Sequence, residues 1–352
     1  MSRVRLGIIG CGVIGNAHLK SAAETPEIET VAVADLREET AKAAAEKFGV
    51  KKVYPSGDTL LEDREIEAVI LAMPAFARMP LALRAFAKGK HVLTEKPVAM
   101  NADEVKTMIK ARGNRIAGCC SPRFRFTRNA EVATKFVASG ALGDLRMVRC
   151  RAVLAAGKPP KNPPPPWRLK KAMNGGGILL NWGCYDLDYL LGITGWKLKP
   201  VMVFAQTWTV PPQFACHAAP GSDAETYYTA LIRCEGGTVL SLERGEFMPV
   251  QSETAWQIIG TKGSLKLNMT IWNKQGQIIH DDTSTEEGVV TKTLWEGAED
   301  LPPANNQLVQ DFAKAIREGR QPMTNLEKAL VVQQISDGIY ASAERGTAVE
   351  IR

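Results

Sequence analysis

The distribution of apolar and polar residues changes once along the chain. Over residues 4 to about 121, short runs rich in Val, Ile, Leu and Ala alternate with segments whose apolar residues recur at helical spacing. Continuous apolar runs are typical of parallel strands that helices bury on both faces. We therefore predict a doubly wound α/β domain, with strands at 4–9, 29–35, 68–73, 91–94 and 115–120 and helices that include 37–48 and 78–88.

The second half has a different rhythm. A helix at 129–139, a long strand at 144–155, a proline-rich loop at 159–166 and a glycine triplet at 175–177 precede a further helix. Strands follow at 201–209, 226–235, 237–246, 254–260 and 263–268, and helices at 307–318 and 326–344 close the chain. Successive strands joined by glycine-containing turns favour antiparallel pairing. We predict a domain boundary after residue 122, with 123–352 forming an α+β domain around a large, mainly antiparallel open sheet.

Bulk composition excludes several classes of protein. The 45% hydrophobic and 23% charged content is that of a folded globular chain. The 44 basic and 38 acidic side chains are dispersed, so no nucleic-acid-binding tract is indicated. Neither a secretory signal nor a run of about 18 apolar residues for a membrane helix is present. The seven cysteines include no C-x-x-C pair, which argues against zinc and disulfides. We expect a cytoplasmic protein with no metal, membrane or nucleic-acid partner.

A glycine motif follows the first predicted strand. Gly10, Gly12 and Gly15 form a G-x-G-x-x-G at the start of a predicted helix, and Asp35 ends the next strand. The first glycine permits a tight turn, the second lets backbone approach a diphosphate, and the third lets helix and strand pack closely. The alternative is a glycine-rich turn without a ligand, which the order of strand, glycines, helix and acid makes less favourable.

Asp35 bears on the choice of cofactor. Its carboxylate can accept hydrogen bonds from ribose hydroxyls and would repel a 2′-phosphate, so NAD is favoured over NADP. Arg37, two residues on, could soften this preference. Residues 1–122 are therefore predicted to be a dinucleotide-binding Rossmann domain.

A charged pair, Glu95 and Lys96, stands directly after the predicted strand at 91–94, and Pro97 follows it. Ligands bind at the carboxyl ends of strands in open α/β sheets. A lysine there could hold a substrate hydroxyl and lower the hydroxyl pKa as hydride leaves. The alternative is a surface lysine paired with Glu95.

With these motifs the chain resembles the Gfo/Idh/MocA family of NAD(P)-dependent oxidoreductases over nearly its full length. The resemblance rests on the GIIGCGVIG start, Asp35, GKHVLTEKP, Pro122-Arg123-Phe124, Trp167-Arg168, GGGILLNWGCYDLDYL, GTKGSL and the terminal helices. It implies a Rossmann domain, an open sheet that mediates a homodimer or homotetramer, and Lys96 as the catalytic lysine. It also places residues 72–76 near the cofactor, although the usual T-P-N is here Met73-Pro74-Ala75, and places Ser121 and Arg123 beside nicotinamide and substrate.

The cofactor-binding residues predicted from motif and resemblance together form one set. They are Gly10, Gly12, Val13, Ile14, Gly15, Asp35, Arg37, Ala72, Met73, Pro74, Phe76, Glu95, Lys96, Ser121 and Arg123.

The helix after the glycine triplet departs from the family pattern. Relatives usually read D-x-G-x-H-x-x-D, with the Asp and His beside the reacting carbon, and the matching positions here are Asn181, Gly183, Tyr185 and Asp188. At about 100° per residue, Asn181, Tyr185 and Asp188 share one face of an apolar helix, which predicts a polar site. Because the usual His is missing, Tyr185 is the natural proton carrier, since a nearby ammonium would lower the pKa of a phenol from about 10. Alternatively Tyr185 only binds substrate while Lys96 acts through water, or the site only binds.

Three further residues are candidates. Trp167 and Arg168 follow the proline run and are predicted to form a stiff substrate-binding wall or, alternatively, a subunit contact. His217, in a predicted loop, could reach the site but is more simply a solvated side chain.

The predicted function is hydride transfer between NAD and a sugar, sugar derivative or cyclitol. Lys96 and Tyr185 handle the proton, and Arg123, Trp167, Arg168, Asn181 and Asp188 bind the substrate. Two rivals follow from the resemblance. An NAD-dependent glycosidase would act through transient oxidation without net NADH, and a non-catalytic sensor would bind NAD and sugar without turnover.

Overall fold

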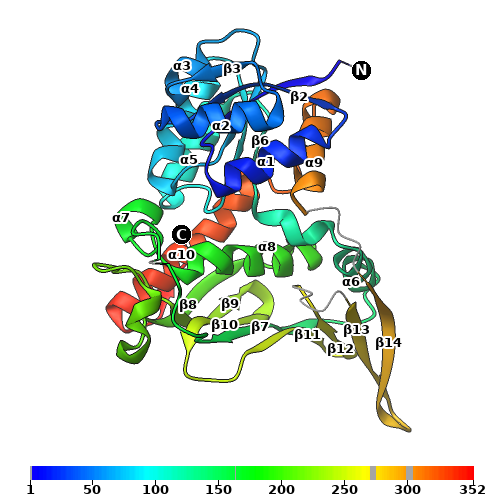
Figure 1. The fold of residues 1–352 in the computed structure, drawn as a ribbon. Helices are drawn as coiled ribbons and strands as arrows, with labels where there is room; N and C mark the ends of the chain where they lie inside the picture. Colours follow the sequence, from blue (N-terminus) through cyan, green and yellow to red (C-terminus); the bar gives the residue numbers. More distant parts are fainter. Residues whose placement is uncertain (1, 163, 270–274, 299–303) are drawn as a thin grey trace. The chain divides into compact units, whose positions relative to one another are not determined.

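The computed structural model describes residues 2–162, 164–269, 275–298 and 304–352, and Figure 1 shows the chain as a ribbon. It divides into two compact units. The first contains Met1–Arg123 and Pro302–Gln333, and the second contains Phe124–Leu301 and Gln334–Arg352. The predicted second domain, 123–352, therefore differs from the structure at Arg123 and over 302–333, which belong to the first unit. Pro163, in the predicted proline-rich loop, lies outside the described residues.

The first unit is built on a six-stranded parallel sheet with the order β3-β2-β1-β4-β5-β6. The strands are β1 (Val4–Ile9), β2 (Ile28–Ala34), β3 (Lys52–Tyr54), β4 (Ala68–Leu71), β5 (His91–Thr94) and β6 (Ala117–Cys119). The order in which the chain adds strands reverses between β1 and β4, and this is the switch point at which doubly wound sheets bind ligands. The predicted parallel sheet is confirmed, with β3 as an additional strand.

Helices join the strands of this unit. They are α1 (Val13–Ala23), α2 (Glu38–Phe48), α3 (Gly57–Leu61), η1 (Ala75–Ala77), α4 (Arg78–Ala87), α5 (Ala102–Arg112) and η2 (Ser121–Phe126), the last of which runs into the second unit. Two later helices contribute as well. α9 (Ala304–Glu318) contacts α1, where Asn306 bonds Glu24 and Gln310 bonds Glu27, and the first residues of α10 (Leu326–Arg345) also belong to this unit.

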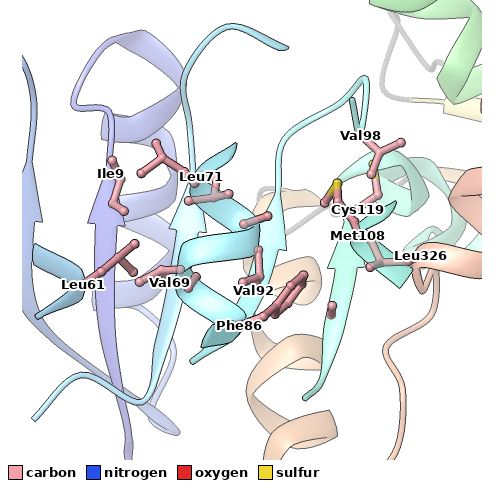
Figure 2. Close-up of a cluster of buried hydrophobic side chains, with 14 of the residues drawn as sticks. Ile9, Leu61, Val69, Leu71, Phe86, Val92, Val98, Met108, Cys119 and Leu326 are labelled. Carbon is pink, nitrogen blue, oxygen red and sulfur yellow. The ribbon is translucent and has the colours of Figure 1, made fainter. Parts of the chain in front are cut away.

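A core of buried aliphatic side chains fixes this sheet. Figure 2 shows Val69, Leu71 and Val92 of the central strands packed with Phe86 of α4, and Leu326 of α10 lies in the same cluster. The side chains of these central strands are buried because helices cover the sheet, so the sequences of the strands are continuously apolar. The carboxyl ends of the strands are thereby held in a fixed register for a site.

The second unit contains a nine-stranded sheet among its described residues, in the order β14-β13-β12-β11-β7-β10-β9-β8-β15. The strands are β7 (Leu145–Ala155), β8 (Pro200–Trp208), β9 (Tyr227–Cys234), β10 (Val239–Met248), β11 (Glu253–Gly260), β12 (Gly263–Leu267), β13 (Gln275–Ser284), β14 (Gly288–Ala298) and β15 (Val349–Glu350). Pairing is antiparallel except between β7 and β10. The mainly antiparallel sheet is confirmed, and the β13–β14 hairpin is an addition to the prediction.

Helical segments complete the unit. They are α6 (Arg128–Ala138), α7 (Lys171–Asn174), η3 (Leu179–Gly183), α8 (Cys184–Ile193), η4 (Pro212–His217) and η5 (Glu235–Gly237). α8 lies along one face of the sheet (Figure 1), where its Asp186 accepts hydrogen bonds from Arg244 of β10 and Trp256 of β11. This buried ion pair anchors the helix to the sheet.

The glycine triplet allows the chain to enter this helix. A Cβ on Gly176 would lie 1.8 Å from the hydroxyl of Tyr340, and one on Gly177 would lie 1.8 Å from the carbonyl oxygen of Glu225. The Glu225 carboxylate accepts hydrogen bonds from the backbone N–H groups of Gly177 and Leu179. A buried acid thus satisfies donors at the helix start that would otherwise lack partners.

The entry to α8 is a π-helical turn, η3, and not a regular α-helix. A π turn holds more residues than an α turn, so Asn181, which lies in it, is rotated relative to Tyr185 and Asp188 of α8. The prediction of a common face assumed a uniform 100° per residue, which this turn does not have, so the shared face of Asn181, Tyr185 and Asp188 stays a prediction. Such turns often occur at functional sites. No helix within the described ranges combines the length and apolarity needed to cross a membrane.

Candidate active site

The glycine-rich turn of the first unit separates structural from ligand-facing positions. Gly10 has a φ of +94°, and a Cβ there would lie 2.5 Å from the carbonyl oxygen of Ala72. A Cβ on Gly15 would lie 1.9 Å from the carbonyl oxygen of Gly10. Nothing lies within 4 Å of a Cβ placed on Gly12. Gly10 and Gly15 are therefore required by packing, whereas Gly12 borders open space that a ligand can approach.

Helix α1 begins immediately after this turn. Its N-cap, Gly12, provides no side-chain hydrogen bond, and the first turn carries no acidic residue. The exposed donors and the helix dipole make such an end favourable for an anion. Val13 is 94% exposed and Ile14 is half-buried, so both predicted residues stand at this end. The geometry fits a dinucleotide diphosphate.

Asp35 lies beside the same turn. One carboxylate oxygen accepts a hydrogen bond from the Cys11 N–H at 2.8 Å, and the other accepts from the Arg37 N–H at 2.9 Å. The Arg37 Nε lies 3.9 Å from the second oxygen. The carboxylate is thus fixed by backbone, while the neighbouring Leu36 is 89% exposed. Sequence reasoning did not single out Leu36. A large apolar residue beside the acid at a strand end could have drawn attention to this position.

Glu95 is buried inside the first unit, so the alternative of a surface ion pair with Lys96 does not describe it. One carboxylate oxygen lies 2.7 Å from His18 Nε2 and accepts from Arg123 at 3.4 Å. The other accepts from the backbone N–H of Lys96 at 3.0 Å. Burial acts to raise the pKa of Glu95, but the His18 hydrogen bond and the charges of Arg123, His18 and Lys96 hold that pKa well below its usual value. The charged carboxylate fixes the backbone at Lys96.

His18 was not predicted as a site residue. It is fully buried on α1, and Cys120 Sγ lies 4.0 Å from its Nε2. His18, Glu95 and Cys120 have the chemistry of metal ligands and lie close together. However, burial raises the pKa of the Cys120 thiol well above its usual value, and Arg123 already contacts the carboxylate. Both features disfavour a cation and favour a network that holds Glu95.

Arg78 joins two loops at the carboxyl edge of the sheet. Its guanidinium donates to the backbone carbonyl oxygens of Met73 at 2.8 Å and Glu95 at 3.0 Å, and also to that of Pro97. The side chain is buried at the start of α4. One planar cation thereby ties the loop after β4 to the loop that carries Lys96. Sequence reasoning missed it because an arginine in a helical pattern gives no sign of burial.

The remaining predicted residues of this unit occupy the same strand ends. Ala72, Met73 and Pro74 follow β4, and Phe76, 47% exposed, lies in η1. Ser121 is buried at the start of η2 after β6, and Arg123 lies in the same segment. The structure therefore gathers the predicted cofactor-binding residues along one edge of one sheet.

In the second unit, Tyr185 and Asp188 belong to α8 and both are buried. The Tyr185 ring packs edge-on against Phe124 at 5.2 Å and against Trp182 at 5.6 Å between ring centroids. Asp188 accepts a hydrogen bond from Arg125 at 3.3 Å. This ion pair gives Asp188 a structural partner, and its predicted contact with substrate stays a prediction. Asn181, in η3, is half-buried.

Arg168 is held in a defined place although it follows the proline-rich loop. The Asn174 side chain donates to the carbonyl oxygens of Trp167 at 2.7 Å and Arg168 at 3.3 Å. The Arg168 guanidinium pairs with Glu246 at the end of β10 and lies 5.7 Å from the centroid of the Phe247 ring. Trp167 is half exposed.

His217 is not the solvated loop residue that its sequence context suggested. It is buried and stacks on Phe247 with 4.8 Å between ring centroids and 17° between planes. Its place in the short helix η4, packed against the aromatic ring, explains the difference.

The fold and the strand-edge geometry define a dinucleotide-dependent oxidoreductase, and comparison with known families agrees. Residues 4–115 match the family described as "Oxidoreductase family, NAD-binding Rossmann fold", and residues 131–266 match the "GFO/IDH/MocA C-terminal domain". The chain belongs to the Gfo/Idh/MocA family of NAD-binding oxidoreductases. It is an NAD(P)-dependent enzyme, and NAD is its cofactor.

Individual relatives cover nearly the whole chain. An "Uncharacterized oxidoreductase ORF334" of Rhizobium meliloti is 30% identical over 98% of both chains. Levoglucosan dehydrogenase of Pseudarthrobacter phenanthrenivorans is 25% identical over 100% of this chain and 99% of its own. Myo-inositol 2-dehydrogenase of Thermotoga maritima is 22% identical over 99% of this chain and 98% of its own. Among solved structures, levoglucosan dehydrogenase with NADH and L-sorbose has a TM-score of 0.85 at 24% identity, with both chains covered completely, which shows the shared fold.

Proposed function

We propose that the protein oxidises a secondary alcohol of a sugar or cyclitol, or reduces the corresponding ketone, with Lys96 and Tyr185 handling the proton. The observation that carries the proposal is the position of Lys96. It follows a buried parallel strand, its backbone N–H is bonded to the buried Glu95, and it stands at the sheet edge that also bears the glycine turn. Relatives named as levoglucosan, myo-inositol and glucoside dehydrogenases support a carbohydrate substrate.

The cofactor is held by groups of the first unit. Backbone at Gly12 and the start of α1 would bind the diphosphate, and Asp35 would accept the ribose hydroxyls. Leu36 would cover an adenine face, since its side chain is almost fully exposed beside Asp35. When bound, NAD supplies the hydride acceptor.

Lys96 has the chemistry of the proton-handling residue. As an ammonium it donates a hydrogen bond to a substrate hydroxyl and stabilises the developing alkoxide, and a neutral amine can take the proton. Its backbone is fixed from two sides, because Glu95 accepts from its N–H and Arg78 donates to the carbonyl oxygens before and after it.

Tyr185 replaces the histidine usual at this position in the family. A phenol can relay a proton that an imidazole would otherwise carry, and packing against Phe124 and Trp182 fixes the ring. We assign Tyr185 the second proton-handling role, and Asn181, Arg123, Trp167 and Arg168 the binding of substrate.

A panel of polyols, glycosides and inositols with NAD and NADP tests this proposal. Wild type is expected to form NADH with at least one sugar or cyclitol. Lys96→Ala should lower kcat by about 10²- to 10⁴-fold, and Tyr185→Phe by more than about tenfold, equal to about 1.4 kcal/mol. The matched controls are Lys88→Ala, an exposed lysine paired with Glu62, and Tyr189→Phe, which loses a buried bond to Asn129.

The outcomes separate the rival functions. Glycoside cleavage without net NADH would replace the dehydrogenase by a glycosidase that oxidises transiently. Binding of NAD and sugar without any turnover would indicate a non-catalytic sensor. A Tyr185→Phe enzyme as active as wild type would remove the tyrosine from proton transfer and leave Lys96 acting through water.

We also propose that a second copy of the chain covers the open face of the nine-stranded sheet. That face exposes Met202, Phe204 and Trp208 of β8 beside Leu231 of β9. It also carries Arg151 of β7 paired with Glu243 of β10, so it offers both charges to an identical surface, as a two-fold interface requires. Light scattering should show a dimer or tetramer for wild type and a smaller species for Phe204→Glu. Equal masses for the two proteins would contradict this interface.

A further inference from the structure

The buried side of helix α1 carries an imidazole. His18 is fully buried there, and the neighbouring buried positions on this helix include Gly15, Leu19 and Ala22. An apolar residue would fill such a position without loss, whereas a buried imidazole costs free energy unless it is hydrogen-bonded. His18 Nε2 lies 2.7 Å from Glu95 Oε1, while Nδ1 has no hydrogen-bond partner among the described residues. The bond to Glu95 is therefore the contact that makes a histidine favourable at this position.

Glu95 extends this contact to Lys96. One carboxylate oxygen, Oε1, lies at the His18 ring and accepts from Arg123 at 3.4 Å. The other, Oε2, accepts from the backbone N–H of Lys96 at 3.0 Å. The carboxylate is buried, so its orientation is set by these donors and not by bulk water. All four residues belong to the first unit, so this chain of hydrogen bonds lies within one compact body.

Several segments bring charged and titratable groups to Glu95. These groups are His18 of α1, Arg78 of α4, Lys96 beside it, Cys120 after β6 and Arg123 of η2. Burial acts to raise the pKa of Glu95, and the His18 hydrogen bond is the strongest of the contacts that hold this pKa below its usual value. Without that bond the pKa of Glu95 should rise. A protonated carboxyl group accepts more weakly from a backbone N–H than a carboxylate does.

From this arrangement we infer that His18 is a positioning residue for the reaction, because through Glu95 it fixes the backbone from which the Lys96 side chain extends. This inference rests on the proposed function, since it concerns the placement of Lys96 for proton transfer. Helix α1 then has two roles. Its first turn borders the predicted diphosphate site, and its second turn holds the loop that bears the proton-handling lysine.

Amide hydrogen exchange at Lys96 tests the link without any substrate. In His18→Leu we expect the Lys96 N–H to exchange about tenfold faster than in wild type, because its acceptor is held less firmly. His18→Gln retains an amide donor about as far from the backbone as Nε2 and should exchange as wild type, whereas the shorter His18→Asn should resemble His18→Leu. Thr25→Val loses a buried bond to the carbonyl oxygen of Ser21 just after the same helix and is the control. Equal exchange in wild type and His18→Leu overturns the inference.

Kinetics with a sugar or cyclitol that wild type oxidises test the consequence for catalysis. We expect kcat of His18→Leu to fall by about ten- to a hundredfold, with KM and the dissociation constant of NADH close to those of wild type. Its kcat should also decline at a higher pH than that of wild type, because Glu95 takes up a proton earlier on acidification. His18→Gln should restore both properties. Thr25→Val should lower the unfolding temperature and leave kcat and its pH profile unchanged, as a purely structural role would.

A double-mutant cycle with Glu95→Gln shows whether His18 acts through Glu95. Adding His18→Leu to Glu95→Gln should change kcat by less than about twofold, since the carboxylate on which His18 acts is already absent. Losses that multiply would mean that His18 acts by another route, and the inference would be wrong. Thermal unfolding identifies a variant that fails to fold, in which case His18→Gln against His18→Asn carries the comparison.

The remaining outcomes separate this inference from the proposed function. If wild type oxidises sugars and His18→Leu keeps the kcat of wild type, His18 only stabilises the fold, and the inference is wrong while the proposed function stands. If wild type oxidises none of the compounds, the proposed function is wrong, and the positioning role falls with it even where exchange at Lys96 is faster.

Discussion

The cofactor edge of the first unit and the polar cluster of the second unit are built in opposite ways. Along the first, Asp35, Glu95 and Arg78 all have protein partners, most of them backbone groups at neighbouring strand ends. In the second, Glu246 and Thr226 each retain a buried atom without a donor. The first arrangement presents a rigid surface that requires no ligand for its integrity. The predicted cofactor-binding edge is thus held largely by backbone groups, whereas Glu246 and Thr226 differ in keeping buried atoms without a partner.

The largest effect is expected from a substitution that removes the rigidity of the cofactor edge. Arg78→Met would remove the guanidinium that donates to the carbonyl oxygens of Met73, Glu95 and Pro97, so we expect a loss of roughly 3 kcal/mol in the free energy of unfolding. Urea unfolding measures it. Arg84→Met, on the same helix but in an exposed pair with Asp58, should cost less than about 1 kcal/mol. Equal losses for the two variants would show that Arg78 does not hold the loops.

Substitutions in the glycine turn distinguish an effect on folding from an effect on cofactor binding. Gly15→Ala would press a Cβ against the carbonyl oxygen of Gly10 and should lower the unfolding temperature, whereas Gly12→Ala meets open space and should fold as wild type. Gly12→Ala should nevertheless weaken the binding of NADH by about tenfold or more, about 1.4 kcal/mol. The added methyl group would occupy the space through which the diphosphate approaches the backbone. Calorimetric titration together with thermal unfolding checks both. Normal NADH affinity in Gly12→Ala would place the diphosphate elsewhere.

A smaller effect is expected on the choice between dinucleotides. Asp35→Ala removes the ribose acceptor and the charge that repels a 2′-phosphate, so NAD should bind about tenfold more weakly and NADP more tightly than in wild type. The dissociation constants of NAD and NADP measure this change in preference. Glu46→Ala, an exposed acid on α2, is the control. A preference for NAD that survives in Asp35→Ala would contradict the role of the carboxylate.

The smallest expected effect is a pH dependence of stability. Because the pKa of Glu95 is lowered in the folded protein, its contribution is fully present above the unfolded pKa of about 4.5 and is lost as pH falls toward the folded value. Wild type should therefore lose stability below about pH 4.5. Glu95→Gln should show a shallower fall over that range, and Glu46→Gln the same fall as wild type. Chemical denaturation at several acidic pH values measures the slopes.

Periodicity and motif order were sufficient to predict most of the fold. Strand runs such as 4–9 and 91–94 were placed to the residue because both their faces are buried. The strands β3, β13, β14 and β15 were missed, and β3 and β14 show a physical reason. β3 has three residues and no apolar run, and β14 is mostly exposed and is held by backbone pairing with β13. Hydrogen bonding without burial leaves little trace in the pattern of apolar residues.

The candidate site was only partly predictable. Gly12, Asp35 and Lys96 follow from local motifs, since each motif is read over a few residues. His18 bonds a residue 77 positions away, and Glu246 pairs with Arg168 across 78 positions. Neither pairing has a local signature, because the partners meet only through tertiary packing. The close approach of the glycine triplet to Glu225 and Tyr340, just before the π turn, likewise has no local signature.

The return of residues 302–333 to the first unit has a consequence for recombination between relatives. A chimera that exchanged only the first 123 residues would join a foreign sheet to the original α9 and the original start of α10, where Leu326 enters the apolar cluster and Gln310 bonds Glu27. Exchange of cofactor preference by gene fusion must therefore transplant two separate stretches of sequence together. The unit that carries the nucleotide-binding motif is therefore discontinuous in sequence.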